Sequence, residues 1–216
     1  MDKLTILGFS SSPVIGGNVD RMVKVILGKS EKSTEFFNLS ELSFGPCRAC
    51  AHLCAGDNLC KLDDELNSLY SKILSAEAIV LGTPTYFSNM NGFMAIFLER
   101  LLAFRHQSFQ LEGKPFVVVA VGAIPGAPEK AIEAVKDRMN AYNASFIGSV
   151  WFESNIFPCF KCGYGLKCKI GGLYYYYGKE GQKNLKITKE LFKRWEESPI
   201  VMSKIEVLGQ KLKNSN

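Results

Sequence analysis

The sequence contains no run of about 18 apolar residues, which is the length that a membrane-spanning helix needs. Its first residues, Met1-Asp2-Lys3, precede a short apolar run and show no signal-peptide pattern. No block of like charge stands out either, although the net charge is +5, so nothing favours a nucleic-acid partner. From these absences we expect a cytoplasmic protein with no membrane and no nucleic-acid partner.

Several common phosphate-binding motifs are also absent. The sequence has no Gly-x-Gly-x-x-Gly dinucleotide motif and no Cys-x5-Arg phosphatase loop. Gly28-Lys29-Ser30 imitates the end of a Walker A loop, but Val23 stands where its first glycine belongs. Ser10 and Gly82-Thr83 occupy the strand ends where a receiver domain carries acidic residues. The sequence therefore favours none of these four functions.

Histidine is scarce, with two residues, whereas there are seven cysteines, an odd number. A chain of 216 residues buries enough surface to fold without disulfides. In a reducing compartment, clustered cysteines are more often metal ligands or redox groups than disulfides. The cysteines are therefore candidates for chemistry.

Short apolar segments rich in β-forming residues alternate with segments of helical periodicity. This alternation predicts a parallel sheet that is covered by helices on both faces. The predicted strands are 4–8, 35–38, 78–81, 116–121 and 146–152, and the predicted helices are 19–27, 63–75, 92–103, 128–141 and 188–213, the last interrupted near Pro199. We expect an α/β doubly wound sheet of order 2-1-3-4-5 over residues 1–155, with a cysteine-rich loop at 47–60. Residues 156–216 would add a second cysteine loop and a helical extension to the same domain.

The turn after the first predicted strand, residues 10–19, is rich in hydroxyl groups and glycine. Free backbone N–H groups at the start of the following helix suit a bound phosphate. An ordinary loop with a helix cap is the alternative for this segment taken alone.

Two segments together resemble the NADPH-dependent FMN reductase superfamily. Ser12-Pro13 with Gly17-Asn18 is similar to its Gly-Ser-Pro-Arg…Gly-Asn-Thr loop. Gly82–Ser88 with Phe97–Arg100 is similar to its Gly-Ser-Pro-x-Tyr-Phe…Phe-Leu-Asp-Arg block. The resemblance covers roughly residues 1–150 and implies a flavodoxin-like fold that binds FMN. The cofactor-binding positions that it implies are Ser10, Ser12, Gly17, Asn18, Val19, Pro84, Thr85, Tyr86, Phe87, Ser88, Gly122, Ala123 and Gly126.

The first loop departs from the family pattern at two positions. Val14 stands where the family has Arg, and Val19 stands where it has Thr. Two polar phosphate contacts are thereby lost, which leaves Ser10, Ser12, Asn18 and backbone amides to hold the phosphate. The turn after the fourth predicted strand also carries Pro125 where the family is usually rich in glycine.

The first cysteine set, Cys47, Cys50, Cys54 and Cys60, places four thiols within fourteen residues. Structural zinc sites usually separate two cysteine pairs by a longer arm, whereas one compact loop suits a [4Fe–4S] cluster. The set resembles the compact motif of the iron–sulfur flavoprotein group, although its middle gap is one residue longer than the commonest spacing. Zinc and free thiols remain as alternatives.

The second cysteine set, Cys159, Cys162 and Cys168, is one thiol short of a closed tetrahedral site. In the predicted sheet, strands 2 and 5 lie at opposite edges, so the two sets should not share one site within a subunit. A second metal site is one interpretation, with a fourth ligand from His52, His106 or elsewhere. Buried or redox-active thiols are the other.

The function that the resemblance implies is electron transfer between a [4Fe–4S] cluster and FMN, and no acid–base catalytic residue stands out. A ferredoxin or NAD(P)H is the expected donor, and the family implies a homodimer or homotetramer. Two alternatives remain: an NAD(P)H-dependent FMN or quinone reductase with structural zinc, and a non-catalytic flavodoxin-type carrier. The aromatic run Tyr174–Tyr177 is either a packing arm or a flap over a neighbouring flavin.

Overall fold

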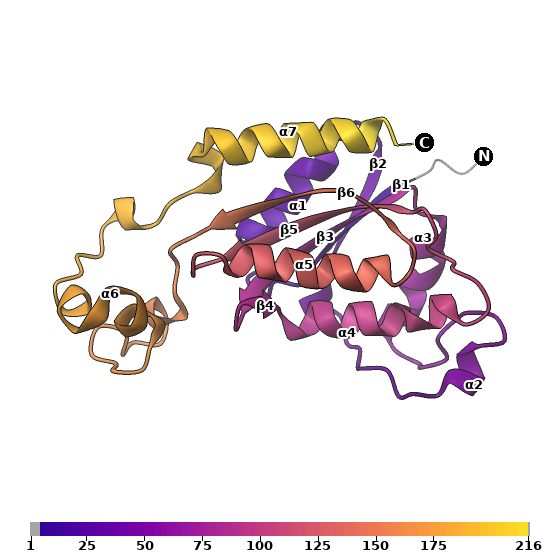
Figure 1. Cartoon of the computed structure of the whole chain (residues 1–216), viewed down its shortest axis with the longest axis horizontal. Helices are drawn as coiled ribbons and strands as arrows, with labels where there is room; N and C mark the ends of the chain where they lie inside the picture. Colours follow the sequence, from indigo (N-terminus) through magenta and orange to yellow (C-terminus); the bar gives the residue numbers. More distant parts are fainter. Residues whose placement is uncertain (1–4, 216) are drawn as a thin grey trace.

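The computed structural model describes residues 5–215, and its centre is a parallel sheet. The five parallel strands are β1 (Thr5–Ser10), β2 (Ser33–Asn38), β3 (Ala78–Tyr86), β5 (Pro115–Gly122) and β6 (Ser145–Glu153), in the order β2-β1-β3-β5-β6 (Figure 1). This order confirms the predicted doubly wound, flavodoxin-like sheet. Leu4, predicted as the first residue of strand 1, lies outside the described residues.

One strand was not predicted. β4 (Asn89–Met90) pairs antiparallel with the end of β3, so that the chain folds back on itself directly after the Pro84–Ser88 segment. β3 is also longer than expected, because its pairing with β5 continues through Pro84. This end of β3 is therefore held on two sides.

Helices cover both faces of the sheet (Figure 1). One face packs against α1 (Asn18–Lys29) and α7 (Pro199–Lys213), whose apolar residues form one core cluster with Ile6, Val80 and Val119. The other face packs against α3 (Tyr70–Ser75), α4 (Gly92–Arg100) and α5 (Ala127–Asn140). Because both faces are covered, the central strands are continuous apolar runs, which is why they were predictable.

Glycine at one sheet position lets α1 sit close to the strands. A Cβ on Gly82 would lie 2.6 Å from the side chain of Val23 and 2.7 Å from that of Val19. The start of α1 is thereby fixed directly beside the ends of β1 and β3.

Four further short elements lie between β2 and β3 or directly after α4. They are η1 (Leu39–Glu41), α2 (Ala51–Cys54), η2 (Glu65–Leu69) and η3 (Leu101–Arg105). The helix predicted over 63–75 thus begins as a 3-10 turn, and the one predicted over 92–103 ends as another.

The C-terminal extension differs most from the prediction. Only α7 of the predicted 188–213 helix is regular, and it follows η5 (Lys189–Leu191) and η6 (Trp195–Glu197). η4 (Pro158–Phe160) and α6 (Gly172–Lys183) precede them, and the Gly/Tyr-rich stretch is helical with a kink at Gly178. Residues 155–194, which we call the tail module, lie beyond the carboxyl end of β6 (Figure 1).

No helix within residues 5–215 is long and apolar enough to span a membrane.

Candidate functional sites

Three loops meet at the carboxyl edge of the sheet, and they are the three that sequence similarity assigns to FMN. The Ser11 N–H donates to the Gly82 carbonyl at 2.9 Å, and the Asn91 side-chain amide donates to the Ser11 carbonyl at 2.7 Å. A Cβ on Gly122 would lie 2.4 Å from Thr85 Oγ1. The structure therefore brings residues 10–19, 82–88 and 122–126 together, as parallel strands require.

A buried carboxylate organises the first loop. Asp20, in the first turn of α1, is 1% exposed. It accepts hydrogen bonds from the Ser10 hydroxyl at 2.5 Å, from the Gly16 N–H at 2.8 Å and from the Asn38 amide at 3.2 Å. Sequence analysis missed Asp20 and Asn38. The only available signal was an acidic residue in a first helical turn, where the helix dipole favours it.

Some of the groups predicted to bind phosphate are already hydrogen-bonded within the first loop itself. The Ser10 hydroxyl donates inward to Asp20, the buried Ser12 hydroxyl accepts from the Val14 N–H at 3.2 Å, and the Gly17 N–H donates to the Val14 carbonyl at 2.9 Å. The helix ladder begins with the Arg21 N–H donating to the Gly17 carbonyl at 3.0 Å. The N–H groups of Asn18 and Val19 therefore precede the ladder and are available to an anion.

Arg21 brings a positive charge to the same loop. Its guanidinium donates to the Asn18 side-chain oxygen at 2.7 Å and to the Gly16 carbonyl at 3.1 Å. It also pairs with Glu196 of η6 at 2.8 Å, so it joins the loop to the C-terminal extension. Sequence analysis noted the missing family Arg at Val14 but did not consider Arg21. Orienting Asn18 Oδ1 toward Arg21 leaves the Asn18 N–H₂ group free as a donor.

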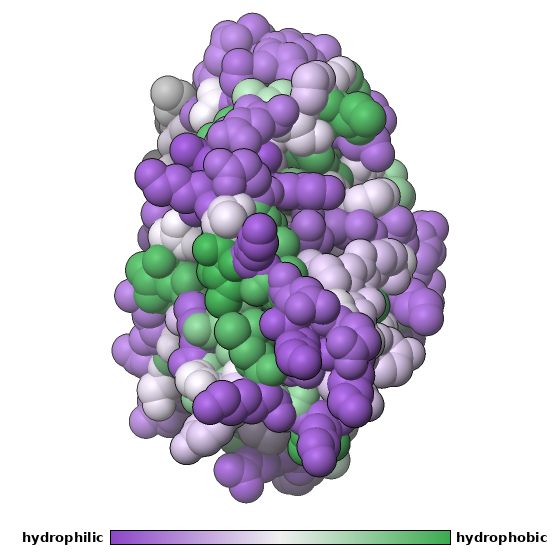
Figure 2. All heavy atoms as spheres, turned by 90° about the vertical axis from the view of Figure 1, so that its left-hand side faces the viewer, coloured by the Kyte–Doolittle hydropathy of each residue, from purple (hydrophilic) through white to green (hydrophobic). Residues whose placement is uncertain are grey.

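Large apolar side chains surround this polar loop. Val14, Ile15, Tyr86, Phe87 and Ile124 are each at least 40% exposed, and they come from all three loops. Figure 2 faces the side of the molecule on which the tail module lies, and it shows apolar surface between polar regions there. Phe87 and Ser88 also have φ of 52° and 55°, a conformation that is strained for residues other than glycine. Strained backbone beside exposed aromatic surface is typical of a ligand site.

The first cysteine set forms a second candidate site. Cys47, Cys50, Cys54 and Cys60 all line one pocket, together with Arg100 and His106. Arg100 is 1% exposed, and it donates to Asp64 at 2.5 Å and to the Tyr70 hydroxyl at 3.0 Å. Its Nε is buried without a hydrogen-bond partner among the described residues. The pocket is thus lined by four thiols and by a cation whose Nε lacks an acceptor among the described residues.

Other polar groups contact these thiols directly. His106 Nε2 lies 3.0 Å from Cys54 Sγ, and burial together with the nearby Cys60 raises the pKa of the Tyr70 hydroxyl. Burial raises the pKa of the Cys54 thiol, and the charges of the three neighbouring cysteines raise it further. Burial acts to lower the pKa of Arg100, but the hydrogen bonds that it donates to Asp64 raise the pKa above its usual range. The guanidinium therefore stays charged beside the thiols.

These donors fit a thiolate-bound cluster in kind. Four sulfur ligands, a buried cation and an imidazole nitrogen that can donate to Cys54 are the kinds of group that stabilise the negative charge of an iron–sulfur centre. Within residues 5–215, however, no group of three or more His, Cys, Asp or Glu side chains is closed into a metal-ligand geometry. The four thiols share a pocket without converging on one point.

The cysteine pocket and the three carboxyl-edge loops lie at opposite ends of α4. Asn91, which caps α4, contacts Ser11, whereas Arg100, nine residues later, lines the pocket. Nine residues of helix rise by about 14 Å. His106, which the sequence left as a possible ligand of the second cysteine set, belongs to this first pocket.

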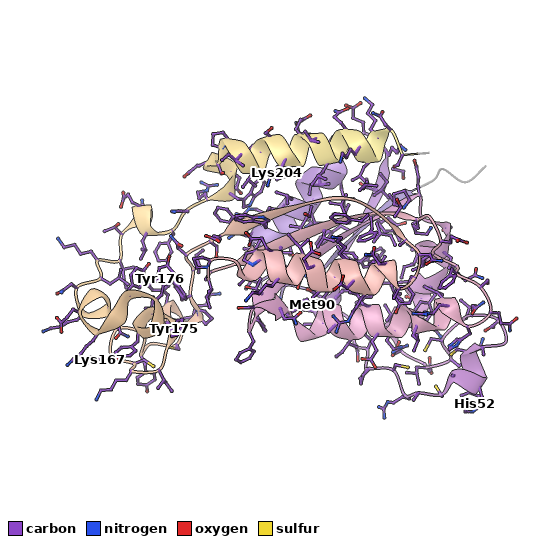
Figure 3. The ribbon with its side chains drawn as sticks, viewed as in Figure 1. His52, Met90, Lys167, Tyr175, Tyr176 and Lys204 are labelled. Carbon is purple, nitrogen blue, oxygen red and sulfur yellow. The ribbon has the colours of Figure 1, made fainter. Side chains whose placement is uncertain are left out.

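The second cysteine set lies on the tail module, far from the first. Figure 3 shows Lys167, Tyr175 and Tyr176 of the module at one end of the molecule and His52 of α2 at the other. The predicted separation of the two sets within one chain therefore agrees with the structure. Tyr176 and Tyr177 pack on Phe157 with ring centroids 5.5 and 6.4 Å away, so part of the tyrosine run is a packing arm.

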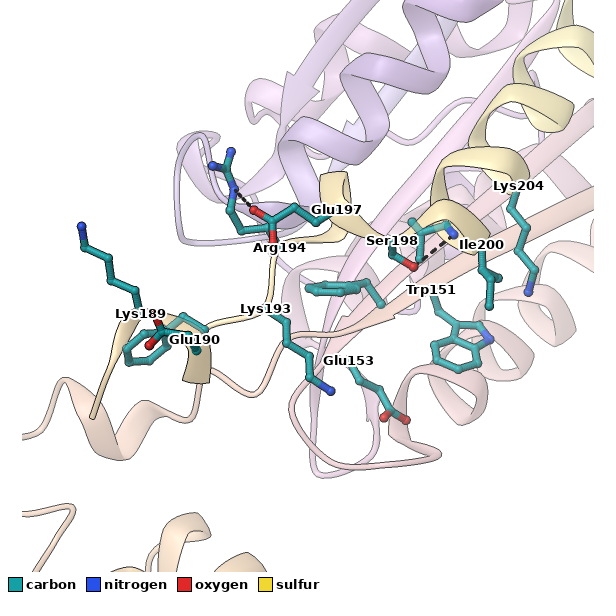
Figure 4. A pocket seen from close by; sticks show the side chains of 13 residues that line it. Trp151, Glu153, Lys189, Glu190, Lys193, Arg194, Glu197, Ser198, Ile200 and Lys204 are labelled. Carbon is teal, nitrogen blue, oxygen red and sulfur yellow. Dashed lines mark hydrogen bonds and ion pairs between the residues drawn. The ribbon is translucent and has the colours of Figure 1, made fainter. Parts of the chain in front are cut away.

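An open pocket of about 620 Å³ lies elsewhere, between the end of β6 and residues 189–204 (Figure 4). Trp151, Lys193 and Lys204 are among its lining residues, and Ser198 caps α7 at its rim through the Val201 N–H. No predicted cofactor residue lines this pocket.

Comparisons with known proteins identify the family region. The family model described as NADPH-dependent FMN reductase matches residues 4–157. An iron–sulfur flavoprotein of Methanosarcina thermophila is 26% identical over 149 residues, which cover 67% of this chain and 78% of that protein. An iron–sulfur flavoprotein of Methanocaldococcus jannaschii is 28% identical over 149 residues, covering 67% and 76%.

A solved structure supports the same fold. The crystal structure of RosB with bound 8-demethyl-8-formylriboflavin-5'-phosphate matches this chain with a TM-score of 0.58 at 16% identity. The match covers 69% of this chain and 64% of RosB, so the chain spans just under two thirds of that protein. At this identity the likeness establishes the fold alone.

Proposed function

The chain belongs to the NADPH-dependent FMN reductase family of flavoprotein oxidoreductases, and we propose that it is an iron–sulfur flavoprotein in which a [4Fe–4S] cluster exchanges electrons with FMN. The observation that carries this proposal is the pocket in which all four cysteines of the 47–60 loop meet a buried guanidinium. The names of the two archaeal relatives support it.

FMN would occupy the carboxyl edge. The N–H groups of Asn18 and Val19 and the Asn18 side chain are free to hold the phosphate, with Arg21 beside them. The exposed apolar groups of Val14, Tyr86 and Ile124 offer surface to an isoalloxazine ring. The loop has no second nucleotide motif, so FAD has no place for its adenosine.

Cys47, Cys50, Cys54 and Cys60 would hold the cluster. Bound there, it would supply single electrons, which FMN can pair for a two-electron acceptor. Arg100 offsets the negative charge of the thiolates, and His106 contacts the sulfur of Cys54. These contacts orient the ligands and tune the potential of the site.

The tail module bears on the electron donor. Residues 155–194 contain nine Lys and Arg against two Glu, a net charge of +7, so the remaining residues carry −2 of the chain's +5. A strongly basic module favours a small acidic donor such as a ferredoxin, because opposite charges speed the encounter. NAD(P)H remains the family's own donor.

The electron path also bears on assembly. Within one chain, the cysteine pocket and the FMN loops are separated by the length of α4, about 14 Å between Asn91 and Arg100. In a homodimer or homotetramer, as the family implies, electrons could also pass from the cluster of one chain to the FMN of another. In such an assembly residues 156–216 would remain an extension of the same domain.

Metal and flavin analysis of anaerobically purified protein tests the proposal. We expect FMN together with four irons and matching sulfide per chain in the first site. Serine at Cys50 should bleach the iron–sulfur absorbance and leave FMN bound, because the flavin loops lie at the other end of α4. Zinc without sulfide in this site would contradict the cluster and favour a zinc-stabilised FMN or quinone reductase.

A further inference from the structure

The tail module has too little core to hold its own fold. Of its forty residues, the buried ones are Phe157, Gly165, Leu173 and Gln182. Segments of roughly 40 residues usually need disulfides, a metal or oligomerisation to be stable, because they bury too little apolar surface. The module lies almost wholly beyond the matched family region, which ends at residue 157.

Two sulfurs of the module converge on a glycine. A Cβ on Gly171 would lie 3.1 Å from Cys159 Sγ and 3.2 Å from Cys168 Sγ. The two sulfurs are therefore at most 6.3 Å apart, the sum of these two distances. Two thiolates on one tetrahedral zinc, each bound at about 2.3 Å, lie about 3.8 Å apart, so a small shift brings them to this spacing. Glycine at position 171 keeps the space between them open.

The loop between these cysteines is closed and pinned from inside. A Cβ on Gly165 would lie 2.4 Å from the Cys159 carbonyl oxygen, so the loop turns tightly back on its start. The buried Gln182 amide donates to the Gly165 carbonyl and to the Cys168 carbonyl, the latter at 2.8 Å. Cys162, on the same loop, is exposed, and its Sγ lies 3.4 Å from the Cys159 carbonyl oxygen.

We propose that Cys159, Cys162 and Cys168 bind a second metal centre, which holds the tail module together. Cys159 and Cys168 already face one space, and rotation of the exposed Cys162 side chain adds the third thiolate. The three sulfurs are not yet closed around one point in the described residues, because the exposed Cys162 thiol is directed at the Cys159 carbonyl oxygen.

The coordination sphere has three protein ligands and an open position. His106 contacts Cys54 in the other pocket and His52 lies on α2, so neither histidine of the chain completes the site. Thiolate ligation of this kind suits zinc or an iron–sulfur cluster, and an open position admits a ligand from outside the chain. The site is independent of the proposed first cluster, because it uses other cysteines at the other end of the molecule.

Metal analysis of the full chain, purified anaerobically, tests this site. The double variant Cys159→Ser/Cys168→Ser should lose either one zinc or an iron–sulfur cluster with its sulfide, and it should keep FMN. Lys169→Ser, which removes an exposed side chain beside Cys168, is the matched control and should keep the metal. Zinc, iron and sulfide contents that all equal those of the parent would overturn the proposal, and would leave a Cys159–Cys168 redox pair as the alternative.

A second variant leaves every thiol in place. Gly171→Ala should displace the metal as well, because its methyl group would lie 3.1–3.2 Å from both sulfurs. Full metal content in this variant would contradict the proposed geometry.

Cleavage by trypsin at Lys161, Lys167 and Lys169 is an independent readout of the fold of the tail module. We expect a chelator to speed this cleavage about tenfold in the parent protein, because it removes the metal that stabilises the module. In the double serine variant the chelator should have no such effect. Cys50→Ser should lower only the iron of the first site, so failure of either site is seen separately.

Discussion

His106 Nε2 lies 3.0 Å from the Sγ of Cys54, although 52 residues separate them in the sequence. The contact joins the end of η3 to the loop that carries the first cysteine set. Arg100, six residues before His106, lines the same pocket. The segment 100–106 thus supplies both the buried cation and the imidazole that contacts a sulfur of the proposed cluster site.

We expect His106→Ala to lower the reduction potential of the bound cluster without removing it. A hydrogen bond to a ligating sulfur stabilises the reduced, more negative state. A hydrogen bond worth about 1 kcal/mol corresponds to about 40 mV for one electron. Potentiometric titration measures the shift. His52→Ala is the control, because His52 is exposed on α2. An unchanged potential in His106→Ala would mean that this contact does not reach a ligand.

Asn18→Asp should weaken FMN binding by about tenfold or more. The change removes the side-chain N–H₂ donor and sets a like charge against the phosphate. Arg21, which contacts Asn18 Oδ1, offsets part of this repulsion. Fluorescence titration with FMN measures the affinity. Asn67→Asp, an exposed position on η2, adds the same charge elsewhere and should bind FMN normally. Equal affinities in the two variants would remove Asn18 from the phosphate site.

Arg21→Ala should also weaken FMN binding, with a smaller effect at high salt. Its guanidinium is the cation that contacts the loop through Asn18 and Gly16, and exposed charges are screened by salt. Arg194→Ala is the matched control, since Arg194 also approaches Glu196, at 3.8 Å, but has no contact with the loop. If both variants lose affinity equally, the effect runs through Glu196 and the C-terminal extension.

Asp20→Asn should lower the stability of the apoprotein by about 1–3 kcal/mol. The amide cannot accept from Ser10, Gly16 and Asn38 together, so at least one buried donor is left without a partner. Thermal unfolding without FMN measures the loss. Asp137→Asn, in α5, is a suitable comparison, because Asp137 has no such contact with the loop. Equal melting temperatures of Asp20→Asn and Asp137→Asn would show that the stability of the loop does not depend on the Asp20 carboxylate.

The elements that could be predicted from the sequence are those with a local hydrophobic pattern. The central strands were predictable because Ala78–Leu81 and Phe116–Val121 are continuous apolar runs. Contacts between side chains that are far apart in the sequence leave no such local pattern. Asn38 reaches Asp20 from 18 residues away, and His106 reaches Cys54 from 52. These contacts depend on the folded path between elements, so the candidate sites were predicted as loops and their scaffolds were not.

The tail module was the least predictable part. Its helix α6 contains Gly172, Gly178 and Gly181 and four consecutive tyrosines, a composition that does not favour a helix. Tertiary contacts overrode propensity here: Tyr176 packs on Phe157, and Gln182 holds the cysteine loop. The N-terminal part of the helix predicted over 188–213 is instead two short 3-10 turns, η5 and η6, and Trp195 of η6 is buried in the core cluster of α1 and α7.

Charge reversal on the tail module tests the proposed acidic donor. We expect the double variant Lys179→Glu/Lys183→Glu to be reduced several-fold more slowly by reduced ferredoxin at low salt. The rate should also depend less on ionic strength than in the parent, because steering by opposite charges is lost. Reduction by dithionite should be unchanged. Lys24→Glu/Lys130→Glu, on α1 and α5, makes the same change of net charge away from the module and is the control. If both double variants slow equally, net charge alone sets the rate, and the module does not receive the donor.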